Sequence, residues 1–134
     1  MTIYIYTDGA SRGNPGSAAA AFIFVKEESK IFEHYKYLGQ QTNNQAEYQA
    51  IILALTKVLD YSEQVFILYS DSELVIKQLN NDYRVKQPHL KLLKKKVVEL
   101  KKNLPSVTFS HISRDNKWIK YADMLCNRCI NENE

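Results

Sequence analysis

The spacing of apolar residues along this chain changes from a strand-like period of two to a helix-like period of three to four, and back again. Three strand-like segments come first, and strand-like and helical segments alternate after them. The segment from Gln64 to Asp71 is an almost continuous apolar run, as expected for a strand that is covered on both faces. This order predicts an α/β fold, because strands joined through a helix are usually parallel neighbours in one sheet.

We predict the following elements from these patterns. Strands are expected at residues 2–7, 17–26, 31–39, 64–71 and 106–111, and helices at residues 44–59, 72–79, 88–104 and 121–130. The first three strands have short links, which favours an antiparallel meander. The first and fourth strands are then parallel neighbours in a mixed sheet that is flanked by helices. The length of 134 residues favours a single domain, 1–134, with a core that needs no disulfide.

The composition excludes several classes of protein. No segment approaches the length of a membrane span, and the N-terminus shows no charged region followed by an apolar one. Two cysteines are too few for a disulfide framework. We therefore expect a soluble protein of the cytoplasm that contacts no membrane, and we take it to be a monomer.

Basic residues are concentrated in one segment. Residues 84–102 contain eight lysines and arginines but only one acidic residue, which suggests an anionic partner. The predicted helix carries one apolar stripe at steps of three and four, so most of its lysines lie off that stripe; its members are Leu90, Leu93, Val97, Leu100 and Leu104. Lys94, Lys95 and Lys96 are the candidate contacts to the partner. A solvated helix face is an equally good interpretation of the same lysines.

Four acidic residues fall at corresponding places in the predicted elements. Asp8 and Asp71 lie at the carboxyl ends of the first and fourth strands, so they emerge at one edge of the sheet, roughly 5 Å apart by strand spacing. Glu47 lies in the first turn of its helix, and Asp123 lies in the first turns of the last helix. Both border an apolar face and point toward the sheet.

Each acid alone has an ordinary explanation as a turn cap or as a partner of a helix N-terminus. Four carboxylates that converge on one edge repel one another, however, and each is driven toward protonation. A divalent cation is the simplest neutraliser, and a set of carboxylate ligands suits Mg²⁺ or Mn²⁺. Two such ions would serve the in-line displacement of a phosphoryl group.

Four blocks of this sequence resemble the motifs of type 1 ribonuclease H, in order and over nearly the whole chain. They are YTDGASRGNPG, TNNQAEYQAIILAL, YSDSELVIKQL and YADMLCNRCI. The resemblance implies a five-stranded mixed sheet of strand order 3-2-1-4-5 with strand 2 antiparallel. It also implies an endoribonuclease that cuts the RNA strand of RNA–DNA hybrids and leaves 5′-phosphate and 3′-hydroxyl ends. The implied cofactor is a pair of Mg²⁺ ions, with Mn²⁺ as a substitute. Its metal-binding acids match Asp8, Glu47, Asp71 and Asp123.

The resemblance also implies residues that bind the substrate. Asn14, Asn43 and Asn44 would contact the hybrid, and their amides suit the 2′-hydroxyls and base edges of a wide minor groove. Thr42 would contact a DNA phosphate. The glycines of the first block, Gly9 among them, would let the backbone approach the substrate closely. An alternative for Asn44 is the N-cap of the helix, and the two roles are compatible.

This chain departs from the family pattern in two places, and one further role has two candidate residues. The segment between Asp71 and Phe109 is too short for the extra basic helix with which some bacterial members grip the hybrid. Glu73 stands where some relatives carry a glutamine that touches substrate. The group that assists product release is either Arg114 or His111, and we favour Arg114 because it reaches further and stays charged.

Two further features have competing interpretations. Cys126 and Cys129 form a C-x-x-C, which fits a redox pair or half of a zinc site, but core packing on one helix face is favoured. Trp118 is expected in the surface loop before the last helix; stacking on a base or ribose is one interpretation, but a surface anchor for the loop is favoured. Two rival functions also remain: a DNA-cutting nuclease of the same broad fold, and a hybrid-binding module without activity. The TNN block argues against the first, and the four acids argue against the second.

Overall fold

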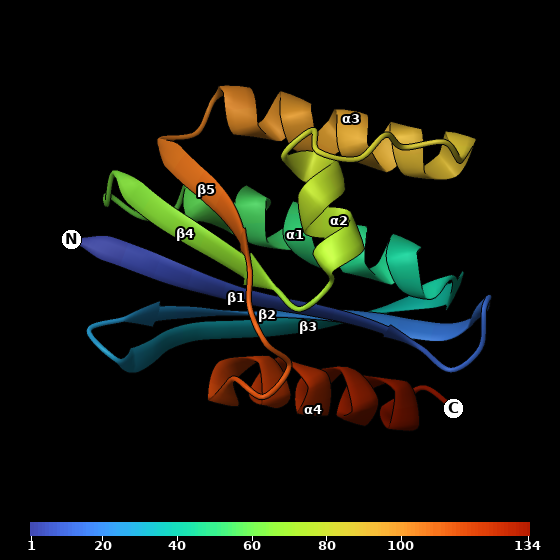
Figure 1. Ribbon diagram of the computed structural model, residues 1–134. Helices are drawn as coiled ribbons and strands as arrows, with labels where there is room; N and C mark the ends of the chain where they lie inside the picture. The colour runs from blue at the N-terminus through green and yellow to red at the C-terminus, as the bar shows by residue number, and fades with distance from the viewer.

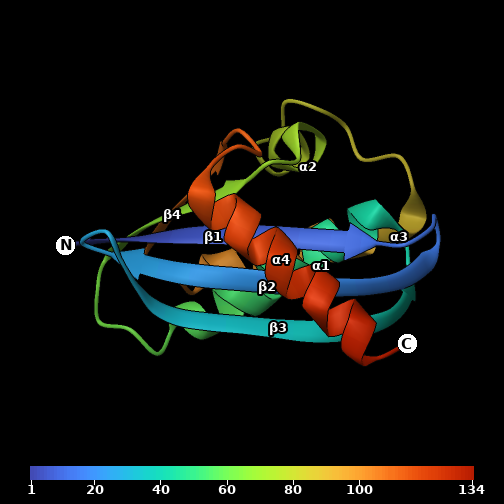
Figure 2. The ribbon, with the colours of Figure 1, turned by 90° about the horizontal axis from the view of Figure 1, so that it is seen from below.

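The computed structural model describes all residues from 1 to 134 and contains five strands and four helices. A single sheet forms the middle layer; α1, α2 and α3 lie on one face of it and α4 lies on the other (Figures 1 and 2). The bounds in chain order are β1 Thr2–Ser11, β2 Gly16–Lys26, β3 Ser29–Gln41, α1 Asn43–Val58, β4 Val65–Ser70, α2 Glu73–Leu79, α3 Pro88–Lys102, β5 Ser106–His111 and α4 Lys117–Glu132.

The sheet has the strand order β3-β2-β1-β4-β5, which confirms the predicted topology. β2 runs antiparallel to both β1 and β3, whereas β1 and β4 are parallel, as are β4 and β5. Because α1 connects β3 to β4 across β2 and β1, the carboxyl ends of β1 and β4 come together at one side of the sheet.

The two faces of the sheet carry separate apolar cores. Ile3 and Ile5 of β1 point into the larger core, a cluster of 20 buried residues shared with α1, α2 and α3. Tyr4 and Tyr6 point the other way and pack against the smaller cluster of nine buried residues beneath α4. The period of two in the sequence of β1 therefore reflects two faces that are both covered.

β1 extends beyond the predicted strand, so the expectation that Asp8 ends the strand was wrong. β1 stays paired with β2 as far as Ser11, opposite Ala18, but its pairing with β4 ends at Tyr6, opposite Tyr69. The antiparallel partner β2 continues the ladder past Gly9, which lies opposite Ala20. Asp8 therefore lies where β1 runs past the end of β4.

Three helix starts also differ from the prediction. α2 begins at Glu73, one residue later than predicted, with Ser72 as its N-cap. α1 begins at Asn43 with Thr42 as its N-cap, and Gln45 completes a capping box, so Asn44 is not the cap. α4 begins at Lys117 instead of Tyr121, because the Asn116 side chain caps the helix by accepting hydrogen bonds from two backbone N–H groups.

The earlier start of α4 changes the place of two residues. Trp118 lies in the first turn of this helix, not in the preceding loop. Asp123 belongs to the second turn, so the positive helix N-terminus is not its partner. No helix of this protein is long and apolar enough to cross a membrane.

Candidate active site

Asp8 is held in an almost closed environment in the middle of β1, with only 5% of its surface exposed. The neighbouring residues of β1 are buried as well, and its own backbone carbonyl accepts a weak hydrogen bond, 3.4 Å long, from the Cys126 thiol of α4. A carboxyl group in such a place has little access to water and must be neutral or bound to a cation.

α1 packs unusually closely against β1, and this contact positions Glu47 beside Asp8. The backbone N–H of Gly9 donates a 2.7 Å hydrogen bond to Oε1 of Glu47. A Cβ atom on Gly9 would lie 2.2 Å from the backbone carbon of Ala46, so no other residue fits at this position. The structure therefore gives Gly9 a role that the sequence analysis missed: it lets the helix approach the strand, in addition to lining the site.

Three carboxyl groups meet at this point. Asp8, Glu47 and Asp71 each offer an oxygen atom, and these three atoms lie within 4.8 Å of one another. Asp71 follows directly after β4 and is half-buried, and Asp123 reaches the same place from α4 with an exposed side chain. All four acids line one cavity of about 450 Å³, so the predicted convergence is present in the structure.

The pKa values of these acids are displaced in the direction that crowding and burial require. Burial raises the pKa of Asp8 far above its ordinary range, and the charges of Glu47, Asp71 and Asp123 raise it further. Burial and the charge of Asp71 raise the pKa of Glu47, and the hydrogen bond from Gly9 opposes this rise. The metal-free site therefore holds protons at neutral pH.

Two cations line the same cavity. One is Arg114, from the loop before α4, and the other is Lys120, from α4 itself. The charge of Arg114 lowers the pKa of Asp71 more than that of His111 does, although burial raises this pKa overall. His111 is not among the residues that line the cavity, so the geometry favours Arg114 of the two auxiliary candidates.

Lys120 was missed in the sequence analysis. The available signal was its spacing, because a residue three positions before Asp123 lies on the same side of a helix. The late predicted start of α4 concealed this relation. With the helix beginning at Lys117, Lys120 and Asp123 lie one above the other on α4.

Several of the predicted substrate-binding residues gather around the start of α1, and of these only Asn43 lines the cavity of the acids. The backbone N–H of Asn43 donates to Oδ1 of Asn14, a 3.1 Å bond that joins the first glycine-rich loop to the helix. Thr42 uses its hydroxyl oxygen as the N-cap, accepting from the backbone N–H of Gln45 at 3.2 Å. Asn43 lines the cavity, and Asn44 is half-buried beside it in the first turn.

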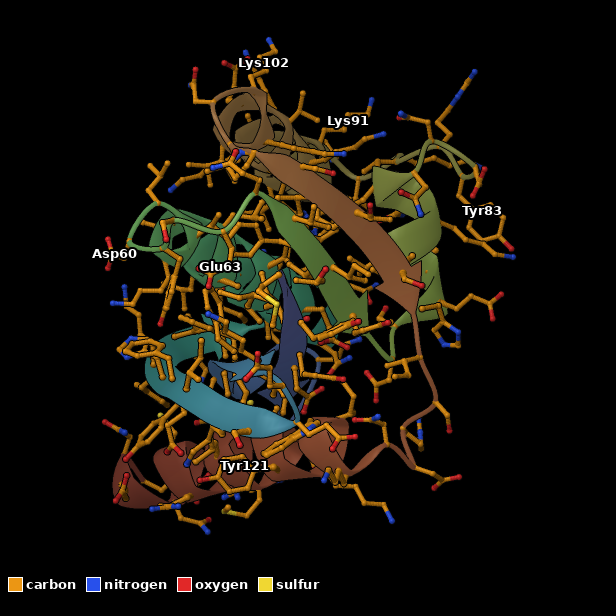
Figure 3. The ribbon with its side chains drawn as sticks, turned by 90° about the vertical axis from the view of Figure 1, so that its left-hand side faces the viewer. Asp60, Glu63, Tyr83, Lys91, Lys102 and Tyr121 are labelled. Atoms are coloured by element: carbon orange, nitrogen blue, oxygen red, sulfur yellow. The ribbon has the colours of Figure 1, made fainter.

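The three candidate lysines of α3 do not act as one group. Lys94 and Lys95 line a second cavity, of about 680 Å³, together with Arg84, Lys91 and Tyr83. Lys96 is absent from its lining because it points away on another side of the helix. Figure 3 shows Tyr83 and Lys91 on the side of the molecule away from α4, which carries Tyr121.

Two other sequence features have structural roles. Cys126 and Cys129 are buried free thiols in the core beneath α4, which confirms the packing interpretation. Burial raises the pKa of both thiols, so they are unreactive at neutral pH. Glu73 is exposed on α2, does not line the acidic cavity, and pairs with Lys77 at 3.1 Å.

Comparison with known proteins gives one consistent result. The family model described as "Reverse transcriptase-like" matches residues 6–129. Ribonuclease HI of Halobacterium salinarum is 35% identical over 131 residues, which are 97% of this chain and 65% of that protein. The chain belongs to the type 1 ribonuclease H family.

Solved structures of the family show the same fold. RNase H1 of Halobacterium salinarum superposes with a TM-score of 0.91 at 34% identity, covering 98% of this chain and 99% of that one. LC11-RNase H1, crystallised in complex with an RNA/DNA hybrid, gives a TM-score of 0.90 at 36% identity, with 98% of both chains covered. The present chain spans about two thirds of the curated archaeal relative, 65% of its length.

Proposed function

We propose that this protein is an endoribonuclease that hydrolyses the RNA strand of RNA–DNA hybrids and leaves 5′-phosphate and 3′-hydroxyl ends. The observation that carries this proposal is the cluster of Asp8, Glu47 and Asp71, whose oxygens lie within 4.8 Å of one another. The complex of LC11-RNase H1 with an RNA/DNA hybrid supports the choice of substrate. We also propose that residues 1–134 act as one catalytic domain, monomeric and cytoplasmic.

The acids fit a pair of divalent metal ions, and Mg²⁺, with Mn²⁺ as a substitute, is the proposed cofactor. Asp8, Glu47, Asp71 and Asp123 offer only hard oxygen ligands, and no lysine or arginine forms an ion pair with any of them. When bound, the two ions would supply an activated water molecule and would neutralise the charge that develops on the leaving 3′-oxygen.

The protein's own residues prepare the site for this chemistry. The contact between Gly9 and Glu47 fixes the position of one carboxylate relative to β1 without a flexible loop. Burial of Asp8 and Glu47 excludes water from the floor of the cavity. Arg114 is the proposed auxiliary group, ahead of His111; its position in the cavity lining supports a contact with the negative charge of the cleaved phosphate.

The hybrid would be held by two surfaces. Asn14, Thr42, Asn43 and Asn44 surround the start of α1 beside the acids, where amide and hydroxyl groups suit the 2′-hydroxyls that distinguish RNA from DNA. The second surface is the groove between α3 and the preceding loop. Its four cations, Arg84, Lys91, Lys94 and Lys95, would contact backbone phosphates.

The rival functions have weaker support. A nuclease that cuts only DNA has no use for a rim of amides facing a minor groove. A module that only binds hybrids would lose affinity by carrying four carboxylates at its binding surface. A module without activity also leaves unexplained why two of these acids are buried side by side.

A cleavage assay tests the proposal. Labelled RNA–DNA hybrid, RNA duplex and DNA duplex are each incubated with Mg²⁺, with Mn²⁺ or with chelator, and the product ends are mapped. We expect cleavage of the RNA in the hybrid, only with a divalent ion. The Asp71→Asn variant serves as the inactive control. Equal cleavage in chelator, or cleavage of the DNA duplex alone, contradicts the proposed function.

A further inference from the structure

The cavity of the active site has walls of opposite charge. Its floor is formed by the acids of β1, α1 and β4, whereas Arg114 and Lys120 line it from the loop before α4 and from α4 itself. The cavity therefore suits an anionic ligand, which would contact the acids through bound metal cations.

Lys120 and Asp123 have a spacing that brings a lysine and an acid together elsewhere in this protein. Lysines with an acid three residues away form ion pairs in three other places: Lys30 with Glu33, Lys57 with Asp60, and Lys102 with Glu99. Asp123 has the same spacing from Lys120 in an unbroken helix, yet the two side chains form no ion pair.

The reason for this difference lies in the position of Asp123. Its carboxylate lines the cavity together with Asp8, while the side chain of Lys120 is exposed at the wall of that cavity. The ammonium group is therefore free to bind another anion. It starts one helical turn from Asp123, a rise of about 4.5 Å along α4.

We infer that Lys120 binds the RNA strand of the substrate at a phosphate adjacent to the one that is cut. The inference rests on the proposed function. The scissile phosphate belongs over the floor of the cavity, where the four acids converge. Lys120 lies about one turn away from Asp123 along α4. Its ammonium group would therefore meet the phosphate next to the scissile one. Lys120 is thus a binding and positioning residue, distinct from Arg114, which serves the cleaved phosphate.

Binding of a labelled hybrid to the Asp71→Asn protein measures this contact without cleavage. Adding Lys120→Gln should raise Kd about three- to tenfold and should reduce the slope of log Kd against log salt by roughly 0.7 to 0.9, the value for one lost phosphate contact. Lys117→Gln is the matched control. Lys117 lies on the same helix over the Trp118 ring, 5.0 Å from its centroid, and does not line the cavity.

A second measurement locates the phosphate. Single phosphates of the RNA strand are replaced one at a time by neutral methylphosphonates, and each hybrid is tested with and without Lys120→Gln. At one position next to the cleavage site, neutralisation should abolish the effect of the substitution, because both changes remove the same contact.

The possible outcomes separate this inference from the proposed function. If the parent protein binds no hybrid, both fail. If it binds and cuts hybrids but Lys120→Gln leaves the salt slope unchanged, or weakens binding no more than Lys117→Gln, only the role of Lys120 is refuted. An effect of the substitution that persists at every neutralised phosphate also refutes it.

Discussion

Replacing Asp8 by asparagine should stabilise the metal-free protein, although it destroys the proposed metal site. In the folded protein the pKa of Asp8 is raised, chiefly by burial and then by the charges of Glu47, Asp71 and Asp123. In the unfolded chain this carboxyl group returns to its ordinary pKa of about 3.9 and is ionised at pH 7. Folding must therefore either bury a charge or take up a proton, and asparagine requires neither.

The size of the expected stability gain follows from the free-energy cost of keeping this proton on the carboxyl group. Keeping a carboxyl group protonated at pH 7 costs about 4 kcal/mol when its unfolded pKa is about 3.9. That value is the largest gain the substitution can give, and we expect about 2–4 kcal/mol. Asp8 is only 5% exposed, so solvent screening reduces the gain little. Without metal, the parent loses stability as the pH rises above the unfolded pKa toward the raised folded pKa. The gain should therefore vanish near pH 4 and grow by up to about 1.4 kcal/mol per pH unit.

Urea unfolding in chelator at several pH values between 4 and 8.5 measures this effect, and the fluorescence of Trp118, the single tryptophan, reports it. Asp115→Asn, an exposed acid in the loop before α4, is the matched control and should change stability little. Saturating Mg²⁺ should reverse the order, because the parent binds the ion and the variant loses a ligand. A variant that is no more stable than the parent in chelator at pH 8 would refute the reasoning.

Three other changes give further tests. Gly9→Ala should destabilise the protein by more than about 3 kcal/mol in urea unfolding, because the new Cβ would lie 2.2 Å from backbone atoms of α1. Arg114→Ala should lower kcat strongly with little change in KM, and His111→Ala should do less, as measured by steady-state cleavage. Replacing Lys91 and Lys95 by glutamine should weaken hybrid binding and reduce its salt slope by up to about two units, as measured by titration at several salt concentrations.

Each of these tests has an outcome that contradicts it. A Gly9→Ala protein within 1 kcal/mol of the parent would mean that α1 moves away from β1 easily. The two auxiliary roles would be reversed if His111→Ala lowered kcat more than Arg114→Ala and if the activity of the parent fell below about pH 6.5. A double lysine variant that matches Lys102→Gln, a residue outside the groove, would show that the groove is only a solvated surface.

Much of the fold was predictable because its information is local. The alternation in β1 and the helical spacing in α3 appear in short windows of sequence, and the order of elements then leaves few topologies. The boundaries that were wrong depended on distant partners or on a cap. β1 continues past Asp8 because β2 stays paired with it, and α4 starts early because the Asn116 side chain caps it.

Residue type and motif spacing are properties of the chain, so the sequence alone was enough to single out the proposed site residues. It placed Asp8, Glu47, Asp71 and Asp123 in the site without any coordinates. Only the tertiary structure decided how they meet. The Gly9 contact that orients Glu47 joins residues 38 positions apart. The freedom of Lys120 likewise depends on Asp123 lining the cavity together with Asp8, from a strand far away in the chain. Such relations arise from packing between elements, and no local pattern of sequence records them.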